Sequence, residues 1–147
     1  MTWPETSSAD PIRILLVEDD DGDAKAVERT FFKTRNAKSI VRAVDGIEAL
    51  EILQGTDLRP RLQKPYLLLV DLNLPRMNGL ELVAAIREDP QLRDTVVFVL
   101  TTSNRQQDKN AAYALKVAGY IPKEKAGENF QNLFNLVDSY RRIVELP

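Results

Sequence analysis

The sequence feature that most constrains the fold is a run of five apolar residues, Tyr66 to Val70, that leads directly into an acid, Asp71. A continuous apolar run bounded by turn signals predicts a strand that is buried on both faces, as strands of a parallel sheet are. Open α/β sheets bind their ligands at the carboxyl ends of the strands. We therefore expect Asp71 to lie at the edge of the sheet where a ligand binds.

Short apolar runs alternate with segments of helical spacing along the rest of the chain. The expected strands are residues 12–17, 39–44, 66–70, 95–100 and 119–122. The expected helices, in which apolar residues recur at helical intervals, are residues 24–32, 47–53, 80–87, 105–117 and 130–143. Residues 55–65 contain glycine and proline without a clear period and predict a surface loop. Strands that alternate with helices favour a three-layered α/β fold with a parallel sheet and right-handed crossovers.

The composition limits the chemistry of any site. The 147 residues, of which 44% are apolar, suit one domain with a sizeable core. The absence of cysteine and histidine excludes a thiolate nucleophile, an imidazole base and most zinc sites, so a bound metal must be hard and oxygen-ligated. The well-mixed charges, with a net charge of −2, do not favour nucleic acid or an anionic membrane as a partner. With no membrane-length apolar run and no signal pattern, a cytoplasmic protein is expected.

Polar side chains of compatible chemistry follow four of the expected strands. They are three carboxylates, a hydroxyl and an ammonium, from Glu18, Asp19, Asp71, Thr101 and Lys123. Because parallel strands end at one edge of a sheet, these groups are expected to converge. Taken alone, the lysine would be interpreted as a solvated surface residue.

The acids after the first strand have two explanations. Helix capping and the first-turn preference for acids explain Asp20, Asp21 and Asp23. Capping does not explain Glu18 and Asp19, whose mutual repulsion favours a bound cation. Carboxylates without imidazole suit Mg²⁺, and a carboxylate such as Asp71 can attack a phosphoryl group to form an acyl phosphate. Positive charge and hydroxyl donors would then stabilise the phosphoryl oxygens.

The same residues stand in motifs that resemble the response-regulator receiver domain, the CheY-like fold. These motifs are V-E-D at 17–19, D-G-x-E-A-L at 45–50, D-L-N-L-P-x-M-N-G at 71–79, L-T-T-S at 100–103 and Y-I-P-K at 120–123. The resemblance implies a doubly wound sheet of five parallel strands in the order 2-1-3-4-5, flanked by five helices. It assigns residues 12–141 to the receiver domain, with a flexible N-terminal arm at 1–11 and a C-terminal tail at 142–147.

The resemblance also implies a role for each site residue. Asp71 would accept a phosphoryl group from a phosphohistidine of a sensor histidine kinase. Glu18, Asp19, Asp71 and the backbone carbonyl of Asn73 would place Mg²⁺, and Lys123 would provide a counter-charge. The protein would then be a phosphoacceptor switch of the single-domain type, which catalyses only its own phosphorylation and dephosphorylation.

Thr101 and Tyr120 would be the switch pair, in which Thr101 moves to the phosphoryl group and Tyr120 turns inward. With no DNA-binding segment after residue 141, the signal is expected to pass through a protein–protein surface to a downstream protein. The expected readout face comprises the helix at 105–117, the strand that carries Tyr120 and the last helix.

A narrower resemblance connects the chain with stand-alone regulators that partner bacterial phytochromes. It rests on V-L-T-T-S at 99–103, the loop at 55–65 and the ending I-V-E-L-P. Some of these regulators dimerise through the last strand, the last helix and a C-terminal extension. The wide apolar face of the helix at 130–143 and the apolar tail fit a homodimer. The alternative is that this face only covers the edge of the sheet.

One departure from the family pattern concerns the residue after Lys123. The family usually has proline there, often in a cis peptide, whereas this chain has Glu124. Either the loop is rebuilt with a trans bond, or a cis bond that costs about 3 kcal/mol is held by its surroundings.

Three other functions compete with a phosphoacceptor switch. An aspartate-nucleophile phosphatase needs an acid/base aspartate two residues after its nucleophile, but Asn73 stands there and cannot transfer a proton. A phosphate-independent interaction module would not need the intact acidic set. A flavin site is disfavoured because the acids of the first loop would repel the phosphate of FMN.

Overall fold

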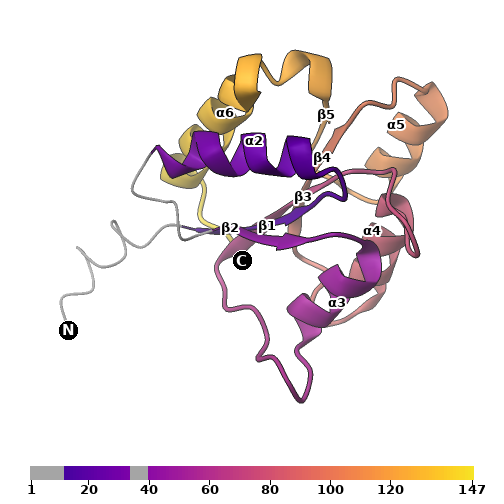
Figure 1. The fold of residues 1–147 in the computed structure, drawn as a ribbon. Coiled ribbons are helices and arrows are strands. Elements are labelled where there is room, and N and C mark those ends of the chain that lie inside the picture. The colour runs from indigo at the N-terminus through magenta and orange to yellow at the C-terminus, as the bar shows by residue number, and fades with distance from the viewer. Residues whose placement is uncertain (1–11, 34–39) are drawn as a thin grey trace.

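The computed structural model describes residues 12–33 and 40–147 and centres on a parallel sheet of five strands (Figure 1). The strands are β1 (Arg13–Val17), β2 (Ile40–Ala43), β3 (Tyr66–Val70), β4 (Val96–Thr101) and β5 (Gly119–Pro122). Their order in the sheet is β2-β1-β3-β4-β5, and every neighbouring pair runs parallel. The doubly wound α/β fold with strand order 2-1-3-4-5 is therefore confirmed.

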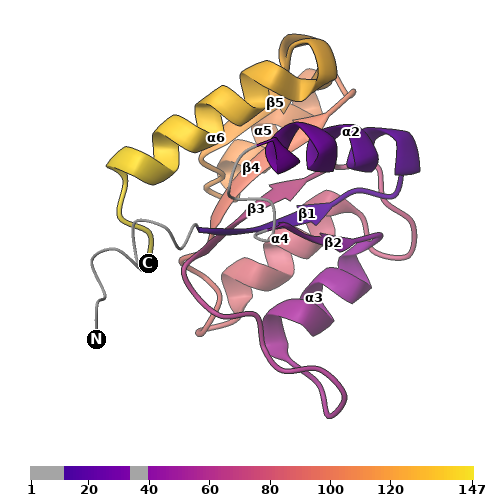
Figure 2. The ribbon, with the colours of Figure 1, turned by 60° about the vertical axis from the view of Figure 1, so that its left-hand side comes forward.

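Helices cover both faces of the sheet. They are α2 (Asp21–Phe32), α3 (Gly46–Gln54), α4 (Gly79–Glu88), α5 (Gln106–Ala114) and α6 (Gln131–Ile143). Helices α2 and α6 lie side by side on one face, and α3 and α4 lie on the other (Figure 2). Helix α5 joins the second group, since Ala112 packs into the same apolar cluster as α3 and α4. Among the described residues, no helix is long and apolar enough to cross a bilayer.

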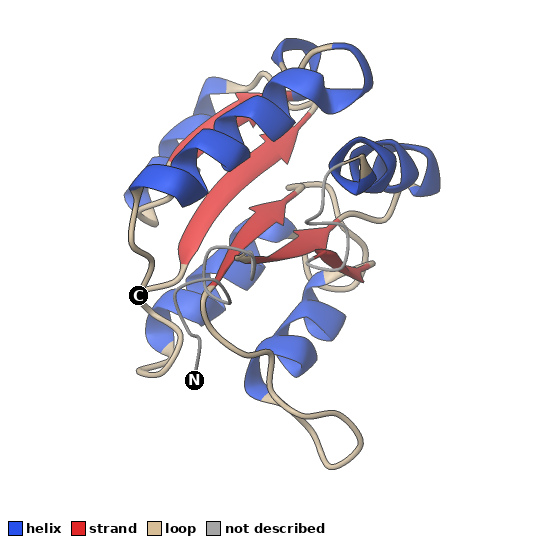
Figure 3. Cartoon of the chain, turned by 90° about the vertical axis from the view of Figure 1, so that its left-hand side faces the viewer, coloured by secondary structure: helices blue, strands red, loops and turns tan. Residues whose placement is uncertain are grey.

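The core has two layers because side chains alternate along each strand. In the central strand β3, Leu67 and Leu69 face the cluster under α2 and α6, whereas Leu68 and Val70 face the cluster under α3 and α4. All five residues of β3 are buried, and full burial of one such side chain contributes about 1.5–3 kcal/mol. The sheet lies between the two helical layers (Figure 3), which explains why this strand is apolar without interruption.

The ends of several elements differ from the expected ones for local reasons. Helix α2 begins at Asp21 rather than at residue 24, because Asp20 is its N-cap and accepts a hydrogen bond of 2.7 Å from the N–H of Asp23. Helix α5 ends at Ala114 rather than at 117, since Lys116 has a left-handed backbone with φ of 63°. Residue 39 and the predicted arm at 1–11 lie outside the described residues.

The C-terminal segment continues the fold beyond residue 141. Helix α6 runs to Ile143, and Leu146 packs against the cluster under α2 and α6. Part of the apolar tail therefore contacts the core of its own chain.

The start of α4 is pressed against the backbone of Asp71. The N–H of Gly79 donates a hydrogen bond of 3.0 Å to the carbonyl of Leu72. A Cβ atom at Gly79 would overlap the carbonyl oxygen of Asp71 and lie 2.8 Å from the Cα of Leu72. A capping box between Asn78 and Glu81 secures the same helix end. The glycine is therefore required by close approach, and the hydrogen bond of its N–H helps to hold the backbone next to Asp71.

Candidate functional site

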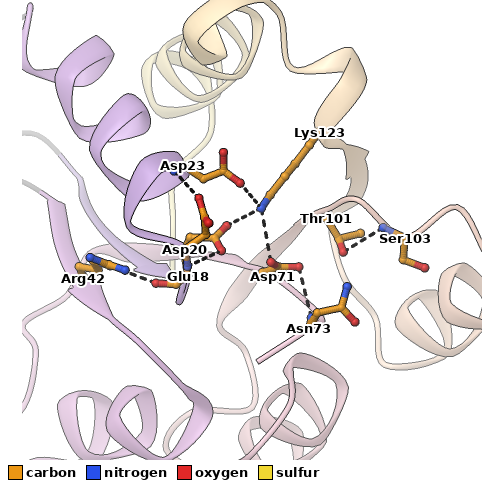
Figure 4. Close-up of polar contacts among 9 residues, drawn as sticks. All are labelled: Glu18, Asp20, Asp23, Arg42, Asp71, Asn73, Thr101, Ser103 and Lys123. Carbon is orange, nitrogen blue, oxygen red and sulfur yellow. Dashed lines mark hydrogen bonds and ion pairs between the residues drawn. The ribbon is translucent and has the colours of Figure 1, made fainter. Parts of the chain in front are cut away.

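The carboxyl ends of β1, β3 and β4 and the residue after β5 meet at one edge of the sheet, as the sequence predicts. Glu18, Asp71 and Thr101 are buried there, and the side chain of Lys123 reaches down toward Glu18 and Asp71 in Figure 4. Asp19 is exposed at the rim. The structure thus brings all five predicted side chains to one site.

Three carboxylates form the centre of the site. One oxygen from each of Glu18, Asp19 and Asp71 lies within 4.8 Å of the others. Backbone hydrogen bonds hold their strands in register, from Glu18 N–H to Ala43 and from Asp71 N–H to Val17. Such close anionic oxygens repel one another unless a cation neutralises them. Their spacing and their oxygen-only donor set suit a small hard cation such as Mg²⁺.

Asn73 contacts the site through its backbone. Its N–H donates a hydrogen bond of 3.3 Å to Oδ1 of Asp71, whereas its side chain is exposed. Asn73 therefore lies next to the central carboxylate, where the resemblance places it, and its role as a metal ligand remains a prediction.

Lys123 reaches the site through a trans peptide. Among the described residues the cis peptide is Lys64–Pro65, so the Lys123–Glu124 bond is trans, and the loop forms a short 3-10 turn, η2 (Lys123–Lys125). The Nζ atom of Lys123 lies 2.7 Å from Oε1 of Glu18 and 3.4 Å from Oδ2 of Asp71. Of the two alternatives for this loop, the rebuilt trans form is the correct one.

Burial and charge shift the pKa values of two groups at the site. Burial raises the pKa of Glu18 to about 7, and the charge of Asp71 adds to the rise, while the hydrogen bond from Lys123 opposes it. For Lys123, burial acts to lower the pKa, but hydrogen bonds to Asp23 and Glu18 and the charge of Asp71 outweigh burial and raise it above its ordinary value. Lys123 therefore remains a cation, and a bound metal would favour the ionised form of Glu18.

Asp23 belongs to the site, which the sequence interpretation missed. Asp20 does cap α2, and the backbone N–H of Asp23 donates to it. The side chain of Asp23, however, accepts a hydrogen bond of 2.7 Å from Nζ of Lys123. The capping explanation was therefore incomplete for Asp23. A signal was available, because the first turn of a helix that follows a strand end lies at the same edge of the sheet.

Arg42 is a second residue that sequence reasoning missed. Its Nε atom donates a hydrogen bond of 3.0 Å to the backbone carbonyl of Glu18, and its Nη1 atom lies 2.9 Å from Oδ1 of Asp21. Its Nη2 atom is buried without a hydrogen-bond partner among the described residues. Arg42 thus supports the acidic loop from β2. An arginine in the middle of an edge strand carries no sequence pattern that distinguishes it from a solvent-facing residue.

The two predicted switch residues are linked through Ser103. Its N–H donates a hydrogen bond of 3.2 Å to Oγ1 of Thr101, and its carbonyl accepts one of 3.1 Å from the hydroxyl of Tyr120. The hydroxyl of Ser103 donates to Asp108 in the first turn of α5. Tyr120 is half-buried and packs against the cluster under α3 and α4. One residue therefore connects the end of β4, β5 and α5.

The loop after Asp71 is anchored to the start of α3. Arg76 binds the buried carboxylate of Asp45 through two nitrogens, at 2.7 and 3.1 Å. The hydrogen bond from Arg76 is the main reason that the pKa of Asp45 lies below its ordinary value. The N–H of Gly46 donates to the carbonyl of Met77 in the same loop. These contacts hold the turn between β3 and α4 on which Asn73 lies.

Comparison with known proteins agrees with this architecture. The family model described as "Response regulator receiver domain" matches residues 14–135. Response regulator Rcp1 of Synechocystis sp. is 35% identical over 127 residues, which cover 86% of this chain and 84% of Rcp1. The Mn(2+)-bound form of Rcp1 superposes with a TM-score of 0.74 at 34% identity, over 93% of this chain and 99% of that one.

Two further structures are similar over nearly their whole length. The phosphorylated cyanobacterial phytochrome response regulator RcpA has a TM-score of 0.80 at 32% identity, covering 93% of this chain and 99% of its own. The bacteriophytochrome response regulator AtBRR has a TM-score of 0.72 at 32% identity, covering 92% and 96%.

Proposed function

The chain belongs to the response-regulator receiver domains of two-component systems, and from this membership we propose that Asp71 accepts the phosphoryl group of its phosphorylation switch. The observation that carries the proposal is the position of Asp71. It is buried at the carboxyl end of β3, with carboxylate oxygens of Glu18 and Asp19 within 4.8 Å and the ammonium of Lys123 at 3.4 Å. This arrangement supports a carboxylate nucleophile beside a cation site.

Phosphoryl transfer to Asp71 balances as a direct displacement. A carboxylate oxygen of Asp71 forms a bond to phosphorus while the bond from phosphorus to the histidine nitrogen of the kinase breaks. The ring, which carries a proton on its other nitrogen, leaves with that electron pair as neutral imidazole, and an acyl phosphate remains. Lys123 neutralises charge on a phosphoryl oxygen, and the hydroxyl of Thr101 donates a hydrogen bond to another.

The cation of the site is proposed to be Mg²⁺. Glu18, Asp19 and Asp71 would hold it together with the carbonyl of Asn73. When bound, it supplies positive charge to the phosphoryl oxygens as charge develops on them. The Mn(2+)-bound form of the relative Rcp1 supports a divalent cation.

The contacts of Ser103 support a switch that uses Thr101 and Tyr120. Before phosphorylation, Oγ1 of Thr101 accepts a hydrogen bond from the N–H of Ser103. When Thr101 turns to donate to the phosphoryl group, this acceptor is lost, and the segment that also holds the hydroxyl of Tyr120 rearranges. We therefore propose that α5, β5 and α6 form the surface that a downstream protein reads.

The kinase partner is proposed to be a sensor histidine kinase of the bacteriophytochrome type, because the relatives include phytochrome response regulators. A homodimer through β5, α6 and the tail is also proposed. Much of the apolar face of α6 packs inside the chain, since Phe134 lies edge-on to Phe31 and Tyr140 lies edge-on to Phe98. The side chains of Leu136 and Ile143 are 41% and 81% exposed, so they are available to pack against a second copy of the chain.

The test of the phosphoacceptor is incubation with Mg²⁺ and acetyl phosphate, followed by intact-protein mass spectrometry. One phosphoryl group should be added to the unmodified chain and none to Asp71→Asn, and EDTA should prevent the addition. Asp57→Asn, in an exposed loop, is the matched control. Equal labelling of Asp71→Asn would disprove the assignment. Phosphate esters should not be turned over, because Asn73 cannot act as an acid or base.

A further inference from the structure

Lys123 is shared among three carboxylates, and one of them, Asp23, has no part in metal binding or in phosphoryl transfer as described above. The Nζ atom lies 2.7 Å from Glu18, 2.7 Å from Asp23 and 3.4 Å from Asp71. We propose that Asp23 is a positioning residue that holds the ammonium of Lys123 back from Asp71 until a phosphoryl group arrives. This inference rests on the proposed function of Asp71.

The side chain of Asp23 is available for this role because its backbone is already fixed. The N–H of Asp23 donates to the N-cap residue Asp20, so capping of α2 uses only the main chain of Asp23. The carboxylate extends across the edge of the sheet to Lys123, one hundred residues away in the sequence. In Figure 4, Asp23 and Glu18 lie on one side of the ammonium and Asp71 lies below it. The pair thus joins the start of α2 to the loop after β5.

The distances from Nζ of Lys123 to the three carboxylates indicate which contacts are strong hydrogen bonds. An ammonium has three N–H donors, and each carboxylate partner takes one. Contacts of 2.7 Å to Glu18 and Asp23 are charge-assisted hydrogen bonds of ordinary length. The contact of 3.4 Å to Asp71 is beyond the usual range for a strong bond. In this state Lys123 therefore binds Glu18 and Asp23 more strongly than it binds Asp71.

Burial decides which contact is released. For Lys123 to move into full contact with a phosphoryl oxygen at Asp71, one of its two contacts of 2.7 Å has to break. The side chain of Glu18 is 2% exposed, so water cannot take the place of the ammonium there. The side chain of Asp23 is 36% exposed, and water can replace the ammonium. The contact between Lys123 and Asp23 is therefore the one that breaks. Because it has to break, it opposes binding of the phosphodonor.

The kinetic consequence is a change in donor affinity more than in the chemical step. Loss of the Asp23 charge removes both a competitor for Lys123 and a repulsion toward the anionic donor. Partly exposed ion pairs change an equilibrium by a factor of about five at most. Asp23→Asn should therefore lower the KM for acetyl phosphate by about threefold to fivefold, with kcat nearly unchanged. Asp23→Glu keeps the charge and should restore the original KM.

The matched control is Asp21→Asn. It removes the same charge from the same helical turn, but the side chain of Asp21 is 75% exposed and pairs with Arg42 instead of Lys123. Two quantities are measured for the unmodified chain and the three variants. The first is the initial rate of phosphorylation against acetyl phosphate concentration at saturating Mg²⁺. The second is the acylation rate of Lys123 by acetic anhydride, relative to the other lysines, from peptide mass spectrometry without any phosphodonor.

The inference is supported if Asp23→Asn lowers KM and speeds acylation of Lys123 while Asp21→Asn changes neither. It is overturned if Asp23→Asn and Asp21→Asn behave alike in both measurements, or if KM rises in Asp23→Asn. The acylation rate also separates the two proposals. If the unmodified chain takes no phosphoryl group, the proposed function fails, and faster acylation in Asp23→Asn alone still establishes that Asp23 restrains Lys123.

Discussion

The hydroxyl of Tyr120 donates a hydrogen bond of 3.1 Å to the carbonyl of Ser103. The N–H of the same residue donates to Oγ1 of Thr101. Movement of Thr101 toward Asp71 would therefore disturb a residue that Tyr120 holds directly. This relationship joins the site to the face formed by β5 and α5.

Tyr120→Phe should weaken this link without affecting the chemistry at Asp71. Loss of one half-buried hydrogen bond costs about 1 kcal/mol, which lowers the melting temperature of a chain of this size by about 2–4 °C. Differential scanning calorimetry measures the shift, and the phosphorylation rate should stay unchanged. Tyr113→Phe, on the exposed side of α5, is the control and should leave the melting temperature the same. An equal shift in both variants would contradict the assigned role.

Asp19→Asn should weaken Mg²⁺ binding by more than about tenfold, because it removes one of three converging anionic oxygens. The side chain is exposed, so the fold should persist. Isothermal titration calorimetry with Mg²⁺ and with Mn²⁺ gives the dissociation constants. Asp57→Asn serves as the control for the loss of one negative charge. Unchanged affinity in Asp19→Asn would mean that the cation binds elsewhere.

Asp45 should make the free energy of unfolding depend on pH below about pH 4. The hydrogen bond from Arg76 lowers the pKa of Asp45 from its ordinary value of 3.8. Because the folded pKa lies below the unfolded one, the stabilisation is complete above pH 4 and is lost as pH falls through the folded pKa. Below about pH 4, Asp45→Asn should therefore show a shallower decline in the free energy of unfolding than the unmodified chain. Urea titrations at several pH values measure both slopes, and identical slopes would contradict the prediction.

Gly79→Ala should destabilise the fold and slow phosphorylation together. The added Cβ would overlap the carbonyl of Asp71, and a clash with backbone costs about 1–3 kcal/mol. Gly22→Ala is the contrasting variant, since its Cβ would meet only the end of the Asp20 side chain at 3.3 Å. Chemical denaturation and acetyl phosphate labelling report the two effects. A variant Gly79→Ala that is as stable and as active as the unmodified chain would show that close approach at this point is not required.

Leu136→Glu combined with Ile143→Glu should convert the proposed dimer to a monomer. Both side chains are exposed on α6, and a charge there opposes burial against a second copy. Light scattering after size-exclusion chromatography gives the mass in each case. Leu58→Glu, at the most exposed of the large apolar side chains in the described residues, should leave the mass unchanged. An unmodified chain that is monomeric at high concentration would refute the dimer.

The sequence was most informative where local pattern and position coincide. The apolar run before Asp71 predicted a strand buried on both faces, and all five of its residues are buried. The family motifs predicted the strand order, which is confirmed. The sequence was less informative about the peptide bond after Lys123. The motif left a cis and a trans form open, and only the structure of the loop showed the trans form.

Asp23 shows what a local pattern leaves out. Its place in an acidic first turn was sufficient to explain it as a helix-end residue. The position of that turn after a strand end indicated the edge of the sheet, but it did not identify Lys123, one hundred residues away, as the partner. The role of Arg42 was likewise visible only in its contacts with the acidic loop after β1. The interior packing of Phe134 against Phe31 was not predictable either, since a wide apolar face has the same pattern whether a helix or a second copy covers it.

The sequence by itself determined the elements, their order along the chain and the kind of chemistry available, because hydrophobic periodicity and residue type act over a few neighbouring residues. The tertiary structure decided which carboxylates Lys123 contacts, at what distance, and which of them water can reach. The physical reason is that burial and ion pairing depend on side chains from remote segments. At the edge of this sheet, the crossovers of the fold bring those segments together.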